Sequence, residues 1–329
     1  MVSTIKDIDE RAFIAQLASV FGKGKDELKV PAGDDDCAVL EFGGEYLVVT
    51  TDMLHQKTDF PDTMTPWQIG WMSAAVNFSD IASMGGHPLG LLAAVGYPKN
   101  MSMEDAGEIA RGMRDCAEFC ETSVIGGDVD SHEELTITGT ALGRVSKEEL
   151  LTRKGAKPGD LVCVTGPLGA AGAALEAYLK NIDFDDDFMK PLLEPVPRIA
   201  EGRMLAKSGA VTSAMDTSDG LALSLYDLAS VNDVGFVLRE ELLPVDRRVF
   251  DIASSEKEAL DMALYSGGDF ELLVTVSREM FDALQAESYL TVVGEIVDID
   301  AGIILIGKDG ANFAINRKGY LHIGTSEQI

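Results

Sequence analysis

The pattern of hydrophobic and polar positions divides the first half of the chain into short strands and two longer helices. Thr65-Pro66 predicts a helix start, with Thr as the N-cap and Pro at the first helical position, and Gly85-Gly86 predicts its end. Ser102, followed by Asp105, predicts the start of a second helix. The expected strands are 37–41, 46–51, 89–96, 123–125 and 135–145, and the expected helices are 66–84 and 103–121.

The second half repeats the mixture of strands and helices after a boundary at 146–159, where charged residues, Gly and Pro gather. We expect two α+β domains, 1–148 and 149–329. The second should contain strands at 161–165, 211–215, 270–276 and 290–297, helices after Gly172, Pro197 and Gly220, and short strands within 303–323.

The acidic composition limits the possible partners. The 55 Asp and Glu residues against 27 Lys and Arg give a formal net charge of −28. Such a surface repels nucleic acid and anionic membranes. It also repels phosphate groups, so phosphate chemistry here requires bound cations. The stretch from Met1 to Arg11 is polar and has no signal-peptide pattern, which predicts a cytoplasmic protein.

Aspartates recur where an apolar run meets Gly, Ser or Thr. Small neighbours allow the backbone to approach a ligand closely, and carboxylate and hydroxyl oxygens are the ligands that Mg²⁺ prefers. A single such segment is more often a turn or a helix cap, and it is the repetition that favours a metal site. The segments are Gly33-Asp34-Asp35-Asp36, Thr50-Thr51-Asp52, Asn77-Phe78-Ser79-Asp80, Gly126-Gly127-Asp128 and Asp216-Thr217-Ser218-Asp219-Gly220.

Asp80 is the most informative of these carboxylates, because it falls in a helix that is apolar on most sides. On an ideal helix it lies opposite Trp71 and Phe78. A buried charge without a partner is costly, and the helix contains no Lys or Arg. A cap or a structural salt bridge is the alternative to a metal ligand. Several such carboxylates repel one another by about 4 kcal/mol per pair at 4 Å and an effective dielectric of 20, unless divalent cations lie between them.

Other motifs carry less information. Arg153, at the domain boundary, is suited to clamp a phosphate, although alone it reads as a solvated linker charge. The glycines at 166, 169 and 172 do not have the spacing of a dinucleotide-binding loop. Cys116 and Cys120 are one helical turn apart, and small buried thiols explain them better than a metal pair.

Taken together, the ordered segments resemble the thiamine-monophosphate kinase family, within the superfamily of aminoimidazole-ribonucleotide synthetase and selenophosphate synthetase. The resemblance covers nearly the whole chain. The matching strings are GDDDCAVL at Gly33, LVVTTDML at Leu47, AAVNFSDIASMGGHP at Ala74, VIGGDVD at Val124, LTRKGAKPGDLVCVTGPLGAAG at Leu151, MDTSDGLALSL at Met215, SGGDFELL at Ser266 and KGYLHIG at Lys318.

The resemblance implies an aminoimidazole-ribonucleotide-synthetase-like fold, with an N-terminal domain that forms a homodimer and a C-terminal α/β domain. It implies transfer of the γ-phosphoryl group of ATP, in line and assisted by several Mg²⁺ ions, to thiamine monophosphate. Matched position by position, it implies metal ligands at Asp35 or Asp36, Thr50, Thr51, Asp52, Asp80, Asp128, Asp216 and Asp219; ATP contacts at Gly127, Asp128, Arg153 and Ser218; and thiamine-side contacts at Asp59, Gly268, Asp269 and Tyr320.

The chain departs from the family pattern at three places. The first loop has three aspartates where two are usual, so Asp35 and Asp36 could exchange roles. Asp59 stands where bacterial members often have His, and the loop 267–271 is one residue shorter than the family form. The alternatives are another ATP-dependent member of the superfamily with a different acceptor, and a non-catalytic protein that binds nucleotide or metal. The acceptor is already an anion, so no general base is expected.

Overall fold

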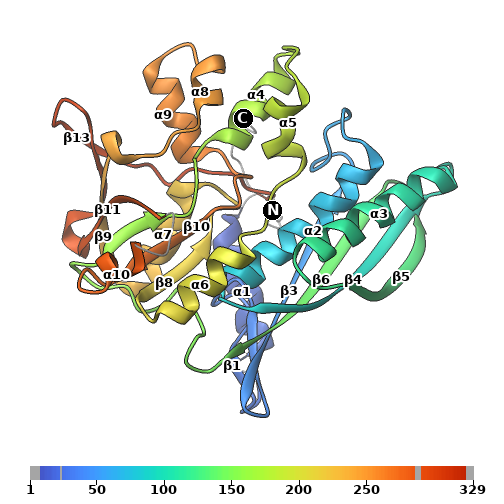
Figure 1. Ribbon diagram of the computed structural model, residues 1–329, viewed down its shortest axis with the longest axis horizontal. Coiled ribbons are helices and arrows are strands. Elements are labelled where there is room, and N and C mark those ends of the chain that lie inside the picture. The colour runs from blue at the N-terminus through green and yellow to red at the C-terminus, as the bar shows by residue number, and fades with distance from the viewer. Residues whose placement is uncertain (1–7, 23, 286–289, 324–329) are drawn as a thin grey trace, which may run out of the picture.

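The computed structural model describes residues 8–22, 24–285 and 290–323, and its strands form two separate sheets (Figure 1). The first seven residues of the polar N-terminal stretch, and the last residue of the string that starts at Lys318, lie outside the described residues. No helix in the described ranges has the length and apolar character needed to cross a membrane.

The N-terminal sheet has six strands in the order β1-β2-β3-β6-β4-β5. All neighbours are antiparallel except β4 and β5, which are parallel. Helices α2 and α3 cover one face, and the core of this half lies between them and the sheet. The elements are β1 (Leu28–Val30), β2 (Ala38–Phe42), β3 (Glu45–His55), α2 (Pro66–Ser83), β4 (His87–Pro98), α3 (Met103–Phe119), β5 (Val124–His132) and β6 (Thr136–Ser146).

Helices α2 and α3 pack so closely that only glycine fits at two points of contact. A Cβ atom on Gly70 would lie 1.9 Å from the carbonyl oxygen of Ile109, and one on Gly112 would lie 1.9 Å from that of Trp67. Both distances are far inside van der Waals contact, so an alanine at either position would force the helices apart. This packing fixes α2, the helix that carries Asp80, against α3.

The C-terminal sheet has seven strands in the order β13-β12-β9-β11-β7-β10-β8. Helices α7 and α9 pack on one face and α6 on the other, so the central strands β7 and β10 are buried on both sides. The elements are β7 (Leu161–Val164), α4 (Ala170–Leu179), α5 (Asp186–Leu193), α6 (Ile199–Ser208), β8 (Val211–Asp216), α7 (Leu221–Asn232), β9 (Val234–Arg239), α8 (Arg247–Ile252), α9 (Glu256–Tyr265), β10 (Leu272–Val276), α10 (Phe281–Gln285), β11 (Thr291–Asp298), β12 (Ile303–Ile306) and β13 (Asn312–Ala314).

The predicted α+β fold class is confirmed, and local signals placed most elements within a few residues. Thr65 caps α2 in a full capping box with Gln68, and Ser102 caps α3. The largest difference is at β5, where the expected strand 123–125 continues to His132 by pairing with β4. The sequence did not predict strands β1 and β9 or helices α5, α8, α9 and α10.

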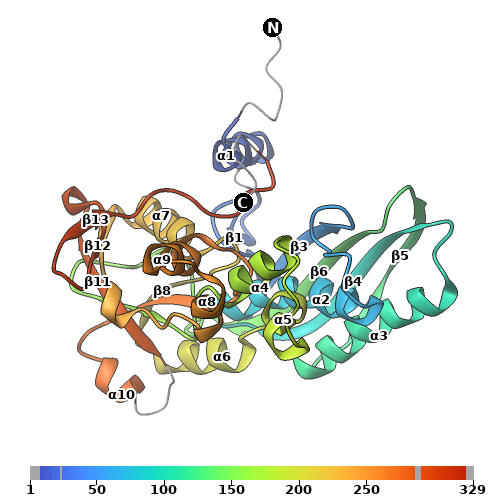
Figure 2. The same cartoon turned by 90° about the horizontal axis from the view of Figure 1, so that it is seen from above.

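Helix α1 (Glu10–Phe21) projects from the body of the molecule and is fastened to the C-terminal half rather than to the N-terminal sheet (Figure 2). Asp9 pairs with Arg317, and the Glu10 carboxylate accepts hydrogen bonds from the backbone N–H groups of His322 and Ile323. The two halves are therefore linked at the N-terminus as well as at 146–159. The division at residues 148 and 149 remains a prediction.

Candidate active site

A small cavity of about 210 Å³ lies where the two sheets meet. It is lined by side chains from both halves and adjoins a larger cavity of about 950 Å³. Six residues line both: Arg11, Asp35, Asp52, Arg153, Ser218 and Asp219. The predicted metal ligands line the small cavity with a single exception, Asp128; they are Asp35, Asp36, Thr50, Thr51, Asp52, Asp80, Asp216 and Asp219.

Three of these aspartates form what we call the carboxylate cluster: Asp36, Asp80 and Asp216. One oxygen from each lies within 4.8 Å of the others. Asp36 comes from the loop before β2, Asp80 from the last turn of α2, and Asp216 from the end of β8. The cluster therefore forms only when the N-terminal helix packs against the C-terminal sheet.

Hydroxyl groups orient two members of the cluster. Thr50 donates to Asp80 Oδ2 at 2.5 Å. Ser79 donates to Asp216 Oδ2 at 2.5 Å, which links the two halves, and Ser218 donates to Asp216 Oδ1 at 2.9 Å. Within the described residues Asp80 has no basic partner closer than 4.0 Å, which argues against the alternative of a structural salt bridge.

Burial and mutual repulsion disfavour the charged form of these groups. Burial raises the pKa of Asp216 to about 7, and the charge of Asp36 adds to the rise. Burial also raises the pKa of Asp80 well above its ordinary value, with Asp52, Asp216 and Asp36 contributing. Burial raises the pKa of Asp52 to about 6, although His322 acts in the opposite direction.

The residues present fit a divalent cation. The three carboxylates converge without a cation among them other than Arg153, and Asp36 Oδ2 is buried with no hydrogen-bond partner in the described residues. Buried acceptors normally have a partner, so this oxygen is available to a metal. Oxygen ligands of this kind suit Mg²⁺.

The structure separates the roles of Asp35 and Asp36. Asp36 belongs to the carboxylate cluster and its Oδ1 accepts from the guanidinium of Arg153, with Nε at 2.9 Å. The oxygens of Asp35 accept instead from the backbone N–H groups of Arg153 and Asp36, at 2.9 and 3.0 Å. Asp35 thus holds the loop and Arg153 in place, and Asp36 is the better candidate for a metal ligand.

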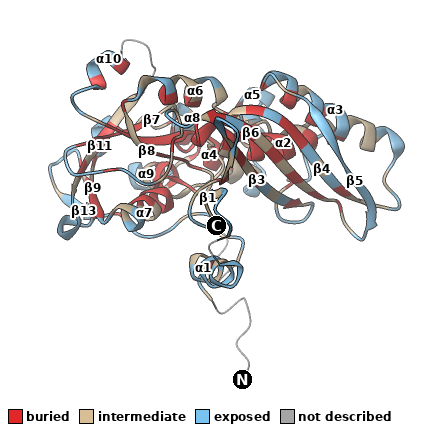
Figure 3. Cartoon of the chain, turned by 90° about the horizontal axis from the view of Figure 1, so that it is seen from below, coloured by how far each residue is buried: buried red, intermediate tan, exposed pale blue. Residues whose placement is uncertain are grey.

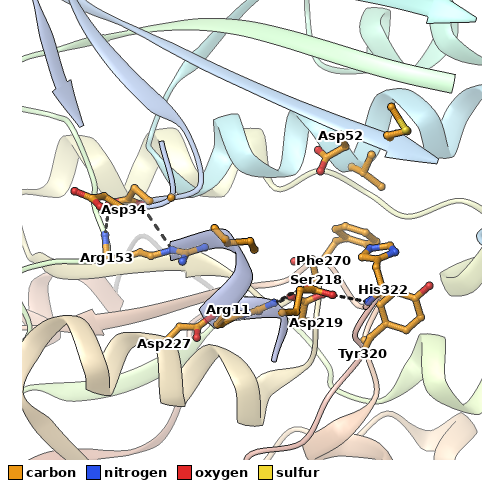
Figure 4. Close-up of a pocket in the computed structure, with 18 of the residues that line it drawn as sticks. Arg11, Asp34, Asp52, Arg153, Ser218, Asp219, Asp227, Phe270, Tyr320 and His322 are labelled. Carbon is orange, nitrogen blue, oxygen red and sulfur yellow. Dashed lines mark hydrogen bonds and ion pairs between the residues drawn. The ribbon is translucent and has the colours of Figure 1, made fainter. Parts of the chain in front are cut away.

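The larger cavity contains most of the residues expected on the thiamine side (Figure 4). Tyr320 and Asp59 face each other, with the phenol Oη 3.4 Å from Asp59 Oδ1. Tyr320 lies edge-on to His322, with ring centroids 4.9 Å apart. Apolar side chains complete this part of the wall: Leu54, Met72, Val76, Leu175, Leu192 and Phe270.

Asp269 does not line this cavity, contrary to the expectation from the sequence. Its carboxylate accepts from the backbone N–H groups of Gly169 and Ala171, at 2.6 and 3.0 Å, at the N-terminus of α4. It therefore anchors the 266–270 loop to that helix, where unpaired N–H groups favour an acceptor. Gly268, on the same loop, does line the cavity.

Gly127 and Asp128 also lie away from both cavities of the single chain. They belong to β5, which is exposed along its whole length (Figure 3). The register places Asp128 opposite Ala94, on the sheet face that α2 does not cover. Thr51 is also exposed, and its hydroxyl bonds Thr140 and the carbonyl oxygen of Gly139 rather than an aspartate.

Several residues of the site were not predicted. Ser79, Phe270 and His322 lie within segments that resemble the family, but their own side chains carried no signal of a role. Arg11 lies outside every such segment. Arg11 is brought to the site by contacts with residues about 210 positions away in the sequence, which no local pattern reveals.

Comparison with known proteins shows the family of the chain. Residues 34–145 match the family described as AIR synthase related protein, N-terminal domain, and residues 157–306 match the corresponding C-terminal domain. Two curated relatives, each named thiamine-monophosphate kinase, come from Methanospirillum hungatei and Pyrococcus horikoshii. The first is 42% identical over 88% of this chain and 92% of its own length. The second is 37% identical over 80% of this chain and 82% of its own.

Solved structures are similar over the whole fold. The structure described as AaThiL complexed with AMPPCP and TMP superposes with a TM-score of 0.86 at 25% identity, and covers 98% of this chain and 100% of that one. Thiamine-monophosphate kinase from Stenotrophomonas maltophilia superposes with a TM-score of 0.75 at 28% identity, and covers 94% and 98%.

Proposed function

This chain belongs to the AIR synthase related proteins and, within them, to the thiamine-monophosphate kinases, and on that basis we propose that it phosphorylates thiamine monophosphate with ATP. The observation that carries the proposal is the convergence of Asp36, Asp80 and Asp216 beside a cavity large enough for an aromatic substrate. A relative of similar fold in complex with AMPPCP, an ATP analogue, and TMP supports both substrates.

We propose that Asp36, Asp80 and Asp216 hold magnesium, with Asp52 and Asp219 on the adjoining wall. Bound magnesium supplies the positive charge that offsets repulsion between two phosphate groups. The protein contributes the fixed positions of these carboxylates, and Thr50, Ser79 and Ser218 hold two of them by hydrogen bonds.

The reaction is a direct transfer of one phosphoryl group. An oxygen of the thiamine monophosphate phosphate forms a bond to the γ-phosphorus of ATP, in line with the bond to the bridging oxygen, which breaks to release ADP. The acceptor oxygen is already anionic, so the chain needs no general base. Arg153, which lines both cavities, is placed to bind phosphate oxygens on the ATP side.

The cavity wall positions the acceptor. The face of Tyr320 is suited to the positively charged thiazolium, and Asp59 adds a negative charge beside it. Gly268 also lines this cavity. Ring binding by these residues would hold the phosphate toward the small cavity, which is the geometry that proximity catalysis requires.

We further propose a homodimer in which β5 of a second copy completes the site. Strands β2, β3 and β6 lie inside the sheet of one chain, so they are not available for hydrogen-bonded pairing with a second copy. The two edges of this sheet are β1, with three residues, and β5, with nine, and the longer edge β5 exposes Ile125 and Val129. An unpaired edge with apolar residues favours association, and a second copy would bring Asp128 to a site that one chain leaves without it.

The function is tested by measuring ATP consumption by the purified protein with Mg²⁺. Thiamine monophosphate should accelerate consumption strongly, and thiamine, which lacks the phosphate, should not. Consumption that does not depend on thiamine monophosphate would assign a different acceptor, and no consumption with any acceptor would favour a non-catalytic nucleotide- or metal-binding protein.

A further inference from the structure

Helix α1 reaches the active site from outside both sheets. Its first turn enters between the C-terminal segment and α7, and Glu10, Arg11, Ile14 and Ala15 line the larger cavity (Figure 2). The Glu10 carboxylate accepts two backbone hydrogen bonds from the segment that carries Tyr320, at 2.7 and 2.8 Å. The first turn of α1 is therefore held on the thiamine side of the cavity.

This anchoring places Arg11 in the wall of the active site. Its Nη2 donates to Asp219 Oδ2 at 2.6 Å and to Asp227 Oδ2 at 3.2 Å, and its Nη1 donates to Glu10 at 3.1 Å. Figure 4 shows the guanidinium next to Ser218 and Asp219, between Arg153 on one side and Phe270 and His322 on the other. Arg11 lines both cavities and thus stands at the passage between them.

Two arginines face the carboxylates around this passage. Six aspartates line the small cavity: Asp35, Asp36, Asp52, Asp80, Asp216 and Asp219. Among the described lining residues only two cations face them, Arg11 and Arg153. Arg153 contacts Asp35 and Asp36 and lies on the side away from Tyr320. Of the two arginines, Arg11 is the closer to the acceptor side.

We propose that Arg11 is a substrate-binding residue that recognises the phosphate group of the acceptor. This inference rests on the proposed function. In the structure the guanidinium pairs with Asp219; when the acceptor enters, its phosphate oxygens take the place of that carboxylate, while Asp227 and Glu10 keep the side chain extended. Arginine suits the role because its planar fork binds two oxygens of one phosphate.

The geometry favours the acceptor phosphate over the phosphates of ATP. The loop that carries Asp219 is bonded to the acceptor side, because the Tyr320 backbone N–H donates to the Asp219 carbonyl oxygen at 3.1 Å. Arg11, Asp219 and Tyr320 therefore form one continuous wall. A phosphate attached to a ring system that stacks on Tyr320 would meet Arg11 before it meets Arg153.

The test compares the binding of thiamine monophosphate with that of thiamine by calorimetry, with the whole protein, Mg²⁺ and a non-hydrolysable ATP analogue present. The two ligands differ only in the phosphate, so their affinity ratio isolates its recognition. Arg11→Gln should lower the affinity for thiamine monophosphate roughly 10- to 100-fold, as expected for the loss of a charge-assisted hydrogen bond. It should leave thiamine binding unchanged, and Arg11→Lys should recover part of the difference.

Arg317→Gln is the matched control. Arg317 fastens the same helix through Asp9, at 3.2 Å, and lines neither cavity. The Arg317→Gln variant should have the same ratio of affinities for thiamine monophosphate and thiamine as the wild type. Equal weakening of both ligands by Arg11→Gln would show that Arg11 only holds α1. No change in the affinity for either ligand would likewise overturn its role. A wild type that binds both ligands equally would instead refute the proposed acceptor, and with it the phosphate contact.

Discussion

The hydroxyl of Ser79 donates a 2.5 Å hydrogen bond to Asp216 Oδ2 and so joins α2 of the first sheet to the end of β8 in the second. This bond lowers the pKa of Asp216 against the rise that burial produces. It therefore helps to keep one member of the carboxylate cluster ionised and ready to bind a cation.

Ser79→Ala should raise the Mg²⁺ concentration needed for half-maximal activity at pH 7, and the defect should shrink at pH 8.5, where Asp216 ionises without help. The lost bond to a buried carboxylate is worth about 1–3 kcal/mol. Ser83→Ala, on the same helix, is the control, because its hydroxyl bonds only the backbone carbonyl of Asp80. A Mg²⁺ requirement that does not respond to pH in Ser79→Ala would contradict this role.

The metal-free protein should lose stability as the pH rises. Burial, with Asp36 adding its charge, raises the pKa of Asp35 to about 7, and the pKa of Asp216 is also about 7. Their ordinary value is 3.8. The folded state therefore binds more protons than the unfolded state between about pH 4 and 7, and the free energy of unfolding should fall across that window.

Urea unfolding in EDTA at pH 5 and pH 8 measures this dependence, and added Mg²⁺ should reduce the difference. Asp80→Asn, which removes one repelling charge, should keep or increase the stability of the metal-free protein at pH 8 while abolishing most turnover. Equal stability at the two pH values, or a large loss in Asp80→Asn, would mean that these carboxylates are balanced by structural partners instead.

Light scattering at micromolar concentration should report a dimer that Leu92→Glu dissociates. Leu92 lies on β4, on the sheet face that α2 leaves open, and is 38% exposed. A buried charge there would oppose association, and activity should fall together with the dimer because Asp128 would no longer reach a partner. Phe250→Glu, at a 59% exposed position on α8, should change neither property. A fully active monomer would refute the shared site.

Tyr320→Ala should raise the KM for thiamine monophosphate about 2- to 30-fold, which corresponds to a cation–π contact of about 0.5–2 kcal/mol. The KM for ATP should hardly change, because the ring touches one substrate only. Tyr320→Phe keeps the aromatic face and should resemble the wild type.

Asp59→Ala should act in the same direction, but Asp59 Oδ2 also accepts from the His55 backbone and from Thr58, at 2.7 and 2.8 Å. Asp59→Asn preserves the shape of this turn and isolates the charge. Equal changes in both KM values for Tyr320 and Asp59 variants would move the acceptor site elsewhere.

Local signals in the sequence predicted much of the fold and most of the small cavity. Thr65-Pro66 and Ser102 act within one helical turn, so their caps could be recognised without the structure. The segments with Asp36, Asp80 and Asp216 were recognisable because a carboxylate next to small residues is a local pattern. Their convergence, however, depends on the packing of α2 against β8, and the resemblance implied that the two halves meet, whereas periodicity did not.

The errors arise where long-range contacts decide the structure. Gly126-Gly127 reads as a turn, and only the pairing with β4 makes it a strand. Asp269 sits in a motif that suggests a ligand contact, but the unpaired N–H groups of α4, about 100 positions away in the sequence, take up its carboxylate. Arg11 reaches Asp219 across 208 positions, so its place at the site could not be predicted from its neighbours.

Phosphorus NMR of the complete reaction tests the central claim most directly. Wild-type protein with ATP, Mg²⁺ and thiamine monophosphate should convert the monoester signal into the two signals of thiamine diphosphate, with one ADP formed per product and no inorganic phosphate. EDTA should stop the reaction. Formation of ADP and inorganic phosphate with thiamine monophosphate unchanged, or conversion that continues in EDTA, would contradict metal-assisted transfer of the γ-phosphoryl group to the acceptor phosphate.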